Sequence, residues 1–343
     1  MGIHTIKVLV VDDSAIVRQA LTSLLQTDRH ITVTVAADPF IAVKKIQEEV
    51  PDVITLDVEM PRMDGITFLK RIMSQRPIPV VIISSLTKKN ADISIEALQL
   101  GAIDVLKKPS LENGQFDSAA WRIIDVIRAA SKVNVLRKQT VPAKVDIVKP
   151  PVNRSEFSTD FKIVAVGAST GGTEALLQFL QALPEDCHGI VIVQHMPEVF
   201  TKSFADRLNV ACKIAVKEAE PGDSIVRGRA LIAPGNKHME IRRSGTRYFV
   251  HVFDGDPVNR HRPSIDVLFL SVAQYAGPNS IGIIMTGMGA DGAKGLLQMK
   301  KAGAYTIAQD EKTSVVFGMP KEAIKLNAAE KVLPLNQIAS HIM

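Results

Sequence analysis

Short runs of apolar residues alternate with longer stretches of helical periodicity through the first 130 residues. Five runs rich in Val and Ile predict strands, at residues 6–11, 31–37, 52–57, 79–84 and 102–109. Strands that alternate with helices are typical of βαβ units, in which parallel strands are joined by crossover connections. The pattern therefore predicts an α/β domain built on a five-stranded parallel sheet.

The same alternation returns after residue 160. Helices are expected at residues 172–183 and 264–276. Residues 239–253 differ, because apolar and polar positions alternate on both sides of Ser244-Gly245, which predicts a β-hairpin turn there. Six apolar runs predict strands, at residues 162–167, 189–195, 214–219, 229–234, 280–287 and 305–309. We expect a doubly wound, mostly parallel α/β domain with one hairpin.

The stretch between these halves has no sustained period and contains Pro142, Pro150 and Pro151. Such a composition is typical of a partly extended linker. The predicted organisation is a domain at 1–130, an interdomain linker at 131–160 and a second domain at 161–343. A length of 343 residues suits this division, since typical domains have about 150 residues.

Composition narrows the class of protein. The net charge of +5 divides into −1 for residues 1–130, +3 for 131–160 and +3 for 161–343, so no segment is basic enough to predict nucleic-acid binding. No apolar run approaches the ~18 residues of a membrane span, and the N-terminus lacks a signal-peptide pattern. A cytoplasmic location without membrane insertion is expected. Cys187 and Cys212 lack C-x-x-C spacing and are expected to be buried, reduced thiols.

Polar side chains follow four strands of the first domain. They are Asp12 and Asp13, Asp57, Ser84 and Lys108. Because the carboxyl ends of parallel strands share one edge of a sheet, these groups should converge. Carboxylates so close together stay ionised when a cation is bound, and oxygen ligands favour Mg²⁺. Asp57 can then act as a nucleophile toward a phosphoryl group.

Residues 1–130 resemble a response-regulator receiver domain through "VVDDS" and "DVEMPRMDG". The resemblance implies a flavodoxin-like fold, phosphorylation of Asp57 by a sensor histidine kinase, and Mg²⁺ held by the acidic cluster and the backbone carbonyl of Glu59. It also implies that Ser84 and Lys108 contact the phosphoryl group. Many receivers carry a switch aromatic where this chain has Val105, so switching by an aromatic flip is not expected.

Three strands of the second domain end in residues that hydrolases use. Ser169 follows the strand at 162–167, His195 ends the next, and Asp291 follows the strand at 280–287. A serine, a histidine and a carboxylate that meet at a sheet edge can serve as nucleophile, base and orienting group. Taken singly, Ser169 and Asp291 could instead be helix caps, and His195 a structural histidine.

A competing hypothesis arises in the same region. Gly287, Gly289 and Gly292 match G-x-G-x-x-G after a strand, and Asp310 follows about 20 residues on, the formal pattern of a dinucleotide site. A receiver joined to a nucleotide-binding or non-enzymatic output module is therefore the alternative. The dinucleotide pattern leaves Ser169, His195 and the residues of the receiver-like first domain unexplained.

Five motifs resemble the catalytic domain of chemotaxis-type protein-glutamate methylesterases, the CheB family. They are "VGASTGG", "VQHM", "HRPSIDVLF", "TGMGADGAKGL" and "AQDEKTSVVFGMP". The resemblance implies hydrolysis of glutamate methyl esters on chemoreceptors, with release of methanol, and deamidation of receptor glutamines. It assigns Ser169 as nucleophile, His195 as general base and Asp291 as orienting acid. It further implies support from Thr170, an oxyanion contact from the Met288 N–H, and no cofactor for ester hydrolysis.

Overall fold

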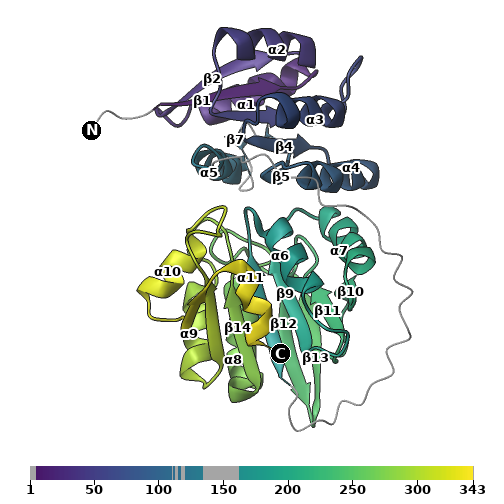
Figure 1. The fold of residues 1–343 in the computed structure, drawn as a ribbon, viewed down its shortest axis with the longest axis vertical. Coiled ribbons are helices and arrows are strands. Elements are labelled where there is room, and N and C mark those ends of the chain that lie inside the picture. Colours follow the sequence, from purple (N-terminus) through teal and green to yellow (C-terminus); the bar gives the residue numbers. More distant parts are fainter. Residues whose placement is uncertain (1–4, 110, 113–114, 117–119, 134–161, 343) are drawn as a thin grey trace. The chain divides into compact units, whose positions relative to one another are not determined.

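The computed structural model describes residues 5–109, 111–112, 115–116, 120–133 and 162–342 (Figure 1). The chain divides into two compact units, Met1–Pro142 and Ala143–Met343. The predicted linker lies almost wholly outside the described residues. No helix in the described part of the chain is long and apolar enough to cross a membrane.

The first unit contains the predicted five-stranded parallel sheet, in the order β2-β1-β3-β4-β5. Its strands are β1 (Ile6–Val11), β2 (Ile31–Ala36), β3 (Val53–Leu56), β4 (Val80–Ser84) and β5 (Asp104–Lys107). Its helices are α1 (Ala15–Leu25), α2 (Pro39–Glu48), α3 (Gly65–Gln75), α4 (Lys88–Gln99) and α5 (Ala120–Ala130). A small hairpin that the sequence did not predict, β6 (Leu111–Glu112) and β7 (Gln115–Phe116), precedes α5.

Burial explains the apolar runs of this sheet. Every residue of β3 and β4 is buried, as expected for central parallel strands covered on both faces. Leu21, Leu24 and Leu25 of α1 pack with Ile123 and Ile127 of α5 against one face of the sheet.

The second unit is built on a seven-stranded parallel sheet, in the order β10-β11-β9-β8-β14-β15-β16. Its strands are β8 (Ile163–Ala168), β9 (Gly189–Gln194), β10 (Ala215–Glu218), β11 (Arg229–Ile232), β14 (Ser280–Ile284), β15 (Tyr305–Gln309) and β16 (Lys331–Leu333). The short edge strand β16 was not predicted, because three residues carry too little periodicity.

Helices cover both faces of this sheet, as the doubly wound prediction requires (Figure 1). Apolar side chains of α8 and α9 form one core with the sheet and the hairpin, while α6, α7 and α11 lie over the other face. The helices are α6 (Gly172–Gln181), α7 (Phe200–Ala211), α8 (Ile265–Tyr275), α9 (Ala293–Lys301), α10 (Met319–Lys325) and α11 (Leu335–Ile338).

The predicted hairpin is a separate two-stranded sheet, β12 (His238–Ser244) and β13 (Arg247–Phe253). Its turn lies one residue later than predicted. Ser244 pairs with Arg247, so Gly245 and Thr246 form the two-residue loop. Gly245 has φ 59°, a left-handed conformation that glycine adopts without steric cost, and this fixes the turn.

Candidate functional site

Ser169 leaves the sheet at the end of β8. Its N–H donates to the Thr286 carbonyl oxygen at 3.0 Å, and its own carbonyl accepts from the N–H of Gly172 at 2.7 Å. The helix that follows begins with Gly171 as N-cap, with φ 77° and no side-chain cap bond. Ser169 is therefore not the helix cap that it could have been from the sequence, and its side chain is available for another role.

His195 lies beside Ser169 because of strand pairing. Ala168 pairs with Gln194 across β8 and β9, so the next residue of each strand leaves the sheet at the same place. The His195 N–H donates to the Ala168 carbonyl oxygen at 3.1 Å. The Gln194 side-chain amide donates to the Ser169 carbonyl oxygen at 2.9 Å, which ties the two strand ends together.

Asp291 reaches the same edge from the loop after β14. Its Oδ2 lies 2.9 Å from His195 Nε2, and both side chains are 1% exposed. The structure thus brings His195 and Asp291 into direct contact although 96 residues separate them. Because Asp291 engages Nε2, the ring nitrogen on the other edge of the imidazole is Nδ1.

The Asp291 carboxylate also accepts four further hydrogen bonds, all from residues 259–266, which lead into α8 and form its start. The donors are Asn259 Nδ2 at 2.7 Å, Ser264 Oγ at 2.7 Å, Ile265 N at 2.7 Å and Asp266 N at 3.2 Å. A cap for the helix after Asp291 was one expectation, but the N-cap of α9 is Gly292. The amides that Asp291 accepts instead belong to the first turn of α8, whose dipole favours a negative charge.

These donors decide the charge of Asp291. Burial favours the neutral acid, but the hydrogen bonds from His195, Asn259 and Ile265 outweigh it and hold the pKa of Asp291 well below its usual range. An ionised carboxylate next to His195 fixes the ring orientation and the Nε2–H tautomer. The arrangement is that of a base with its orienting group.

Thr170 and Met288 lie next to the serine. Thr170 is buried, and its carbonyl oxygen accepts from the Thr286 hydroxyl at 3.0 Å. Met288 follows Gly287, where an added Cβ would lie 2.7 Å from Ser169 Cβ and 2.5 Å from Met319 Sδ. Only glycine allows the loop after β14 to pass so close to Ser169, and this brings the backbone of the adjacent Met288 toward Ser169.

The sequence did not predict the roles of Asn259, Ser264 and Asp266. All three lie in or beside the motif "HRPSIDVLF", which carried the family resemblance without any assigned contact. A signal was present, since polar residues cluster just before an apolar helical stretch. It pointed to a helix start, and only the folded chain shows that this helix start faces Asp291.

The dinucleotide hypothesis is not supported. The space over Gly287 is filled by the Met319 and Ser169 side chains. The Asp310 carboxylate, which would bind a ribose, instead accepts hydrogen bonds from the N–H and hydroxyl of Thr313. Asp291, which lies within the glycine-rich loop, is hydrogen-bonded to His195. These glycines serve close packing around Ser169.

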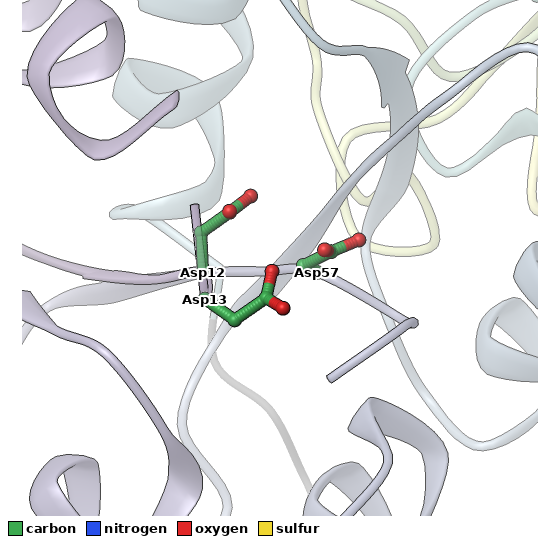
Figure 2. Close-up of side chains that lie close together, drawn as sticks. All are labelled: Asp12, Asp13 and Asp57. Atoms are coloured by element: carbon green, nitrogen blue, oxygen red, sulfur yellow. The ribbon is translucent and has the colours of Figure 1, made fainter. Parts of the chain in front are cut away.

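The first unit carries the predicted acidic cluster. One carboxylate oxygen from each of Asp12, Asp13 and Asp57 lies within 4.8 Å of the other two. Figure 2 shows the three side chains close together, with Asp12 and Asp13 just beyond β1 and Asp57 just beyond β3. Lys108 follows β5, and its Nζ lies 2.7 Å from Asp57 Oδ2 and 2.9 Å from Asp12 Oδ2.

The charges of the cluster depend on one another. Burial raises the pKa of Asp57, although the hydrogen bond from Lys108 opposes the increase. Burial likewise opposes the Lys108 charge, but Asp57 and Asp12 outweigh it and raise the pKa of Lys108. A buried pair of carboxylates with one lysine carries excess negative charge, which a divalent cation could offset.

The structure also describes the other residues that the sequence singled out in this domain. Glu59 donates its N–H to Asp57 Oδ1 at 3.4 Å, and its side chain accepts from Lys89 at 3.0 Å. Ser84 ends β4 and is buried, with its hydroxyl 3.5 Å from the Ser85 carbonyl oxygen. Val105 is 1% exposed within β5.

Family models match both units. Residues 164–342 match the CheB methylesterase model, and residues 8–117 match the response regulator receiver domain model. The second unit is also similar to the crystal structure of the Thermotoga maritima CheB methylesterase catalytic domain, with 40% identity and a TM-score of 0.52. That match covers 53% of this chain and 97% of the other.

Curated relatives match along nearly the whole chain. A Geobacter metallireducens protein named protein-glutamate methylesterase/protein-glutamine glutaminase 3 is 56% identical, and the match covers 98% of each chain. A Rhodopseudomonas palustris protein with the same activities in its name is 54% identical, over all of this chain and 97% of its own. Both units are therefore present in the relatives in the same arrangement along the sequence.

Proposed function

The chain belongs to the CheB family of protein-glutamate methylesterases, and from this premise we propose that it demethylates glutamate γ-methyl esters on chemoreceptors, releases methanol and is activated by phosphorylation. The names of its relatives add protein-glutamine glutaminase activity, which we propose for the same site. The sequence-based expectation of a carboxylic ester hydrolase thus agrees with the family.

One observation carries the assignment of the site. His195 Nε2 and Asp291 Oδ2 are 2.9 Å apart in a buried pair, at the point where Ser169 leaves the neighbouring strand. A nucleophile beside a base, with the base oriented by a third group, is the geometry of covalent acyl transfer. This arrangement supports Ser169 as nucleophile, His195 as general base and Asp291 as orienting acid.

The first half of the reaction follows from these roles. His195 Nδ1 takes the hydroxyl proton as Ser169 Oγ attacks the γ-carbonyl carbon of the ester. The protonated ring then gives that proton to the departing methoxide, and methanol leaves a γ-glutamyl ester on Ser169. Asp291 stays ionised and stabilises the imidazolium during this exchange. For a glutamine substrate the leaving group is ammonia.

Water completes the cycle. His195 takes one proton from water as the water oxygen attacks the acyl carbon, and it gives this proton to Ser169 Oγ when the acyl–oxygen bond breaks. The product leaves as the γ-carboxylic acid of glutamate, which loses the second water proton to solvent and becomes the carboxylate. Backbone N–H groups stabilise the negative oxygen that develops in both halves. We assign one of these contacts to the N–H of Met288, because Gly287 lets its loop approach Ser169. Thr170, buried next to Ser169, supports the turn.

The receiver unit supplies the control. We propose that a sensor histidine kinase phosphorylates Asp57 and that Mg²⁺ is held by Asp12, Asp13, Asp57 and the Glu59 carbonyl. The three clustered carboxylates fit a hard divalent cation. When bound, the metal neutralises charge on the phosphoryl oxygens. Lys108 already contacts Asp57 and is positioned to neutralise the phosphoryl group, and we assign Ser84 a hydrogen bond to it.

A decisive experiment replaces the nucleophile. Ser169→Ala in the full chain is expected to keep the melting temperature and to lower methanol release from a methylated chemoreceptor by at least about 10³-fold. Ser244→Ala, at the exposed hairpin turn, is the matched control and is expected to retain full activity. Near-normal turnover by Ser169→Ala would refute the triad.

A further inference from the structure

A tight turn lies over the His195–Asp291 pair, in the segment 258–264, which we call the strap. Val258 and His261 exchange two backbone hydrogen bonds, at 3.0 Å and 2.9 Å. Between them Asn259 and Arg260 have φ of 52° and 68°. Two successive left-handed residues closed by such a bonded pair form a type I′ turn. The strap therefore holds its side chains in defined directions.

Asn259 joins two buried carboxylates. Its Nδ2 donates to Asp291 Oδ1 at 2.7 Å and to Asp266 Oδ2 at 2.8 Å. A side-chain amide has two N–H donors and no charge, so one group serves both acids. Asp291 and Asp266 are 2% and 5% exposed. Without the amide, Asp266 Oδ2 and Asp291 Oδ1 would lose the one donor group that they share.

Asp266 is itself fixed in place. Its Oδ1 accepts from the Gly295 N–H at 2.6 Å, in the first turn of α9. Asp291 is held in the same way by the amides of Ile265 and Asp266 at the start of α8. Asp266, at the start of α8, is thus bound to the first turn of α9, and Asp291, just before α9, is bound to the first turn of α8. Asn259 connects the two carboxylates.

The other end of the turn contacts the base. The His261 ring stacks on the His195 ring, with centroids 3.7 Å apart and planes at 10°. The imidazole of His195 thus has His261 against its face and Asp291 at its Nε2 edge. Two residues of one turn therefore contact the His195–Asp291 pair. His261 stacks on the face of the His195 ring, and Asn259 donates to the Asp291 oxygen that does not contact His195.

This inference rests on the proposed function. We propose that Asn259 is a positioning residue, which aims the Asp291 carboxylate at His195 Nε2, with Asp266 orienting the amide and the His261 stack fixing the plane of the base. Nothing in the strap reacts with substrate in this scheme. Its effect reaches Ser169 only through the direction and tautomer of His195.

The test removes the amide without disturbing the turn. Asn259→Gly keeps a residue that tolerates the left-handed conformation. Arg260→Gly is the matched control, because it places the same residue at the adjacent left-handed position. We expect Asn259→Gly to lower kcat for demethylation of a methylated chemoreceptor fragment by about 10- to 100-fold, with KM changed less than about 3-fold. Arg260→Gly should stay within about 2-fold of wild type, because backbone effects are shared by both variants.

A double-mutant cycle shows whether Asn259 acts through Asp291. In an Asp291→Asn background, adding Asn259→Gly should lower kcat by less than a further factor of about 2, because the carboxylate that Asn259 positions is already absent. Equal kcat for Asn259→Gly and Arg260→Gly would overturn the proposal. The proposal would also be overturned if Asn259→Gly lowered kcat by the same factor in the wild-type and Asp291→Asn backgrounds. Full activity of Asp291→Asn alone would instead refute the triad, and with it this inference.

Discussion

His195 and Asp291 are joined through Nε2, which lies 2.9 Å from Oδ2 in a pair that is almost completely buried. This contact leaves Nδ1 as the ring nitrogen that can receive the serine proton. It also makes the tautomer of His195 depend on a carboxylate from a distant loop. If Ser169 is the nucleophile, as proposed, its reactivity depends on Asp291, which is far away in the chain.

Replacing Asp291 tests this dependence. Asp291→Asn keeps the size of the side chain, but its new N–H group points at residues that themselves donate hydrogen bonds to Asp291. The His195 ring therefore loses the acceptor that fixes its tautomer. We expect kcat to fall by about 10³- to 10⁴-fold. Initial rates of methanol release measure it, with Asp310→Asn as the control from the neighbouring loop. A loss of less than about 10-fold would show that His195 is oriented by other groups.

Asp291 also makes stability depend on pH. Its pKa is lowered in the folded protein against burial, chiefly by the hydrogen bond from His195. A lowered pKa stabilises the fold above the unfolded value of about 4, and this contribution is lost as pH falls through the folded value. The melting temperature of wild type should thus exceed that of Asp291→Asn at pH 7, with a difference that shrinks below about pH 4. A constant difference from pH 7 to 3 would contradict this expectation.

Gly287 should be sensitive to a single methyl group. An alanine Cβ there would lie 2.7 Å from Ser169 Cβ, and displacement of the nucleophile by even ~1 Å can cost about 10²-fold in rate. Gly287→Ala is expected to lower kcat by about that factor and stability by about 1–3 kcal/mol. Gly245→Ala, whose Cβ would meet open space, is the control for activity. Unchanged kcat in Gly287→Ala would mean that the loop yields without moving Ser169.

Magnesium should stabilise the receiver unit. Mg²⁺ at 100 times its dissociation constant adds about 2.7 kcal/mol to the free energy of unfolding. Thermal unfolding with and without Mg²⁺ should show an increase in wild type that Asp13→Asn and Asp57→Asn remove. Asp92→Asn, an exposed acid on α4, should behave as wild type. Equal stabilisation of all four proteins would place the cation elsewhere.

Both thiols should be unreactive in the native protein. Cys187 and Cys212 are buried, and burial raises the pKa of the Cys187 thiol to about 11. Because the thiolate is the reactive form, a disulfide reagent at pH 8 should modify neither residue until denaturant is added, when both of the two cysteines react. Rapid modification of the native chain would show that one of them is accessible.

The receiver is expected to restrain the catalytic unit before phosphorylation. A chain starting at residue 150 should therefore demethylate receptors faster than the unphosphorylated full chain. A nearly complete switch would require a free-energy difference of about 5.5 kcal/mol between the two states, and a smaller difference would give partial activation. If the shortened chain is no faster, the receiver does not act by restraint.

Much of this architecture could be read from the chain. Apolar runs predicted all five strands of the first sheet and six of the seven strands of the second, because buried parallel strands need continuous apolar residues. The edge strand Lys331–Leu333 was missed because it is short and two of its three residues are exposed. The hairpin turn was misplaced by one residue, since Ser244-Gly245 and Gly245-Thr246 fit a turn almost equally well.

The sequence by itself determined the residue types at the strand ends and their order, and with them Ser169, His195 and Asp291 as candidates. Parallel strands place their carboxyl ends at one edge, so convergence there followed from topology. Only the tertiary structure decided which groups touch. The Asp291 donors come from Asn259 to Asp266, and their distance in the chain from Asp291 conceals the contact. Hydrogen bonds depend on distances of tenths of an ångström, which packing of α8 against α9 sets and no local pattern encodes.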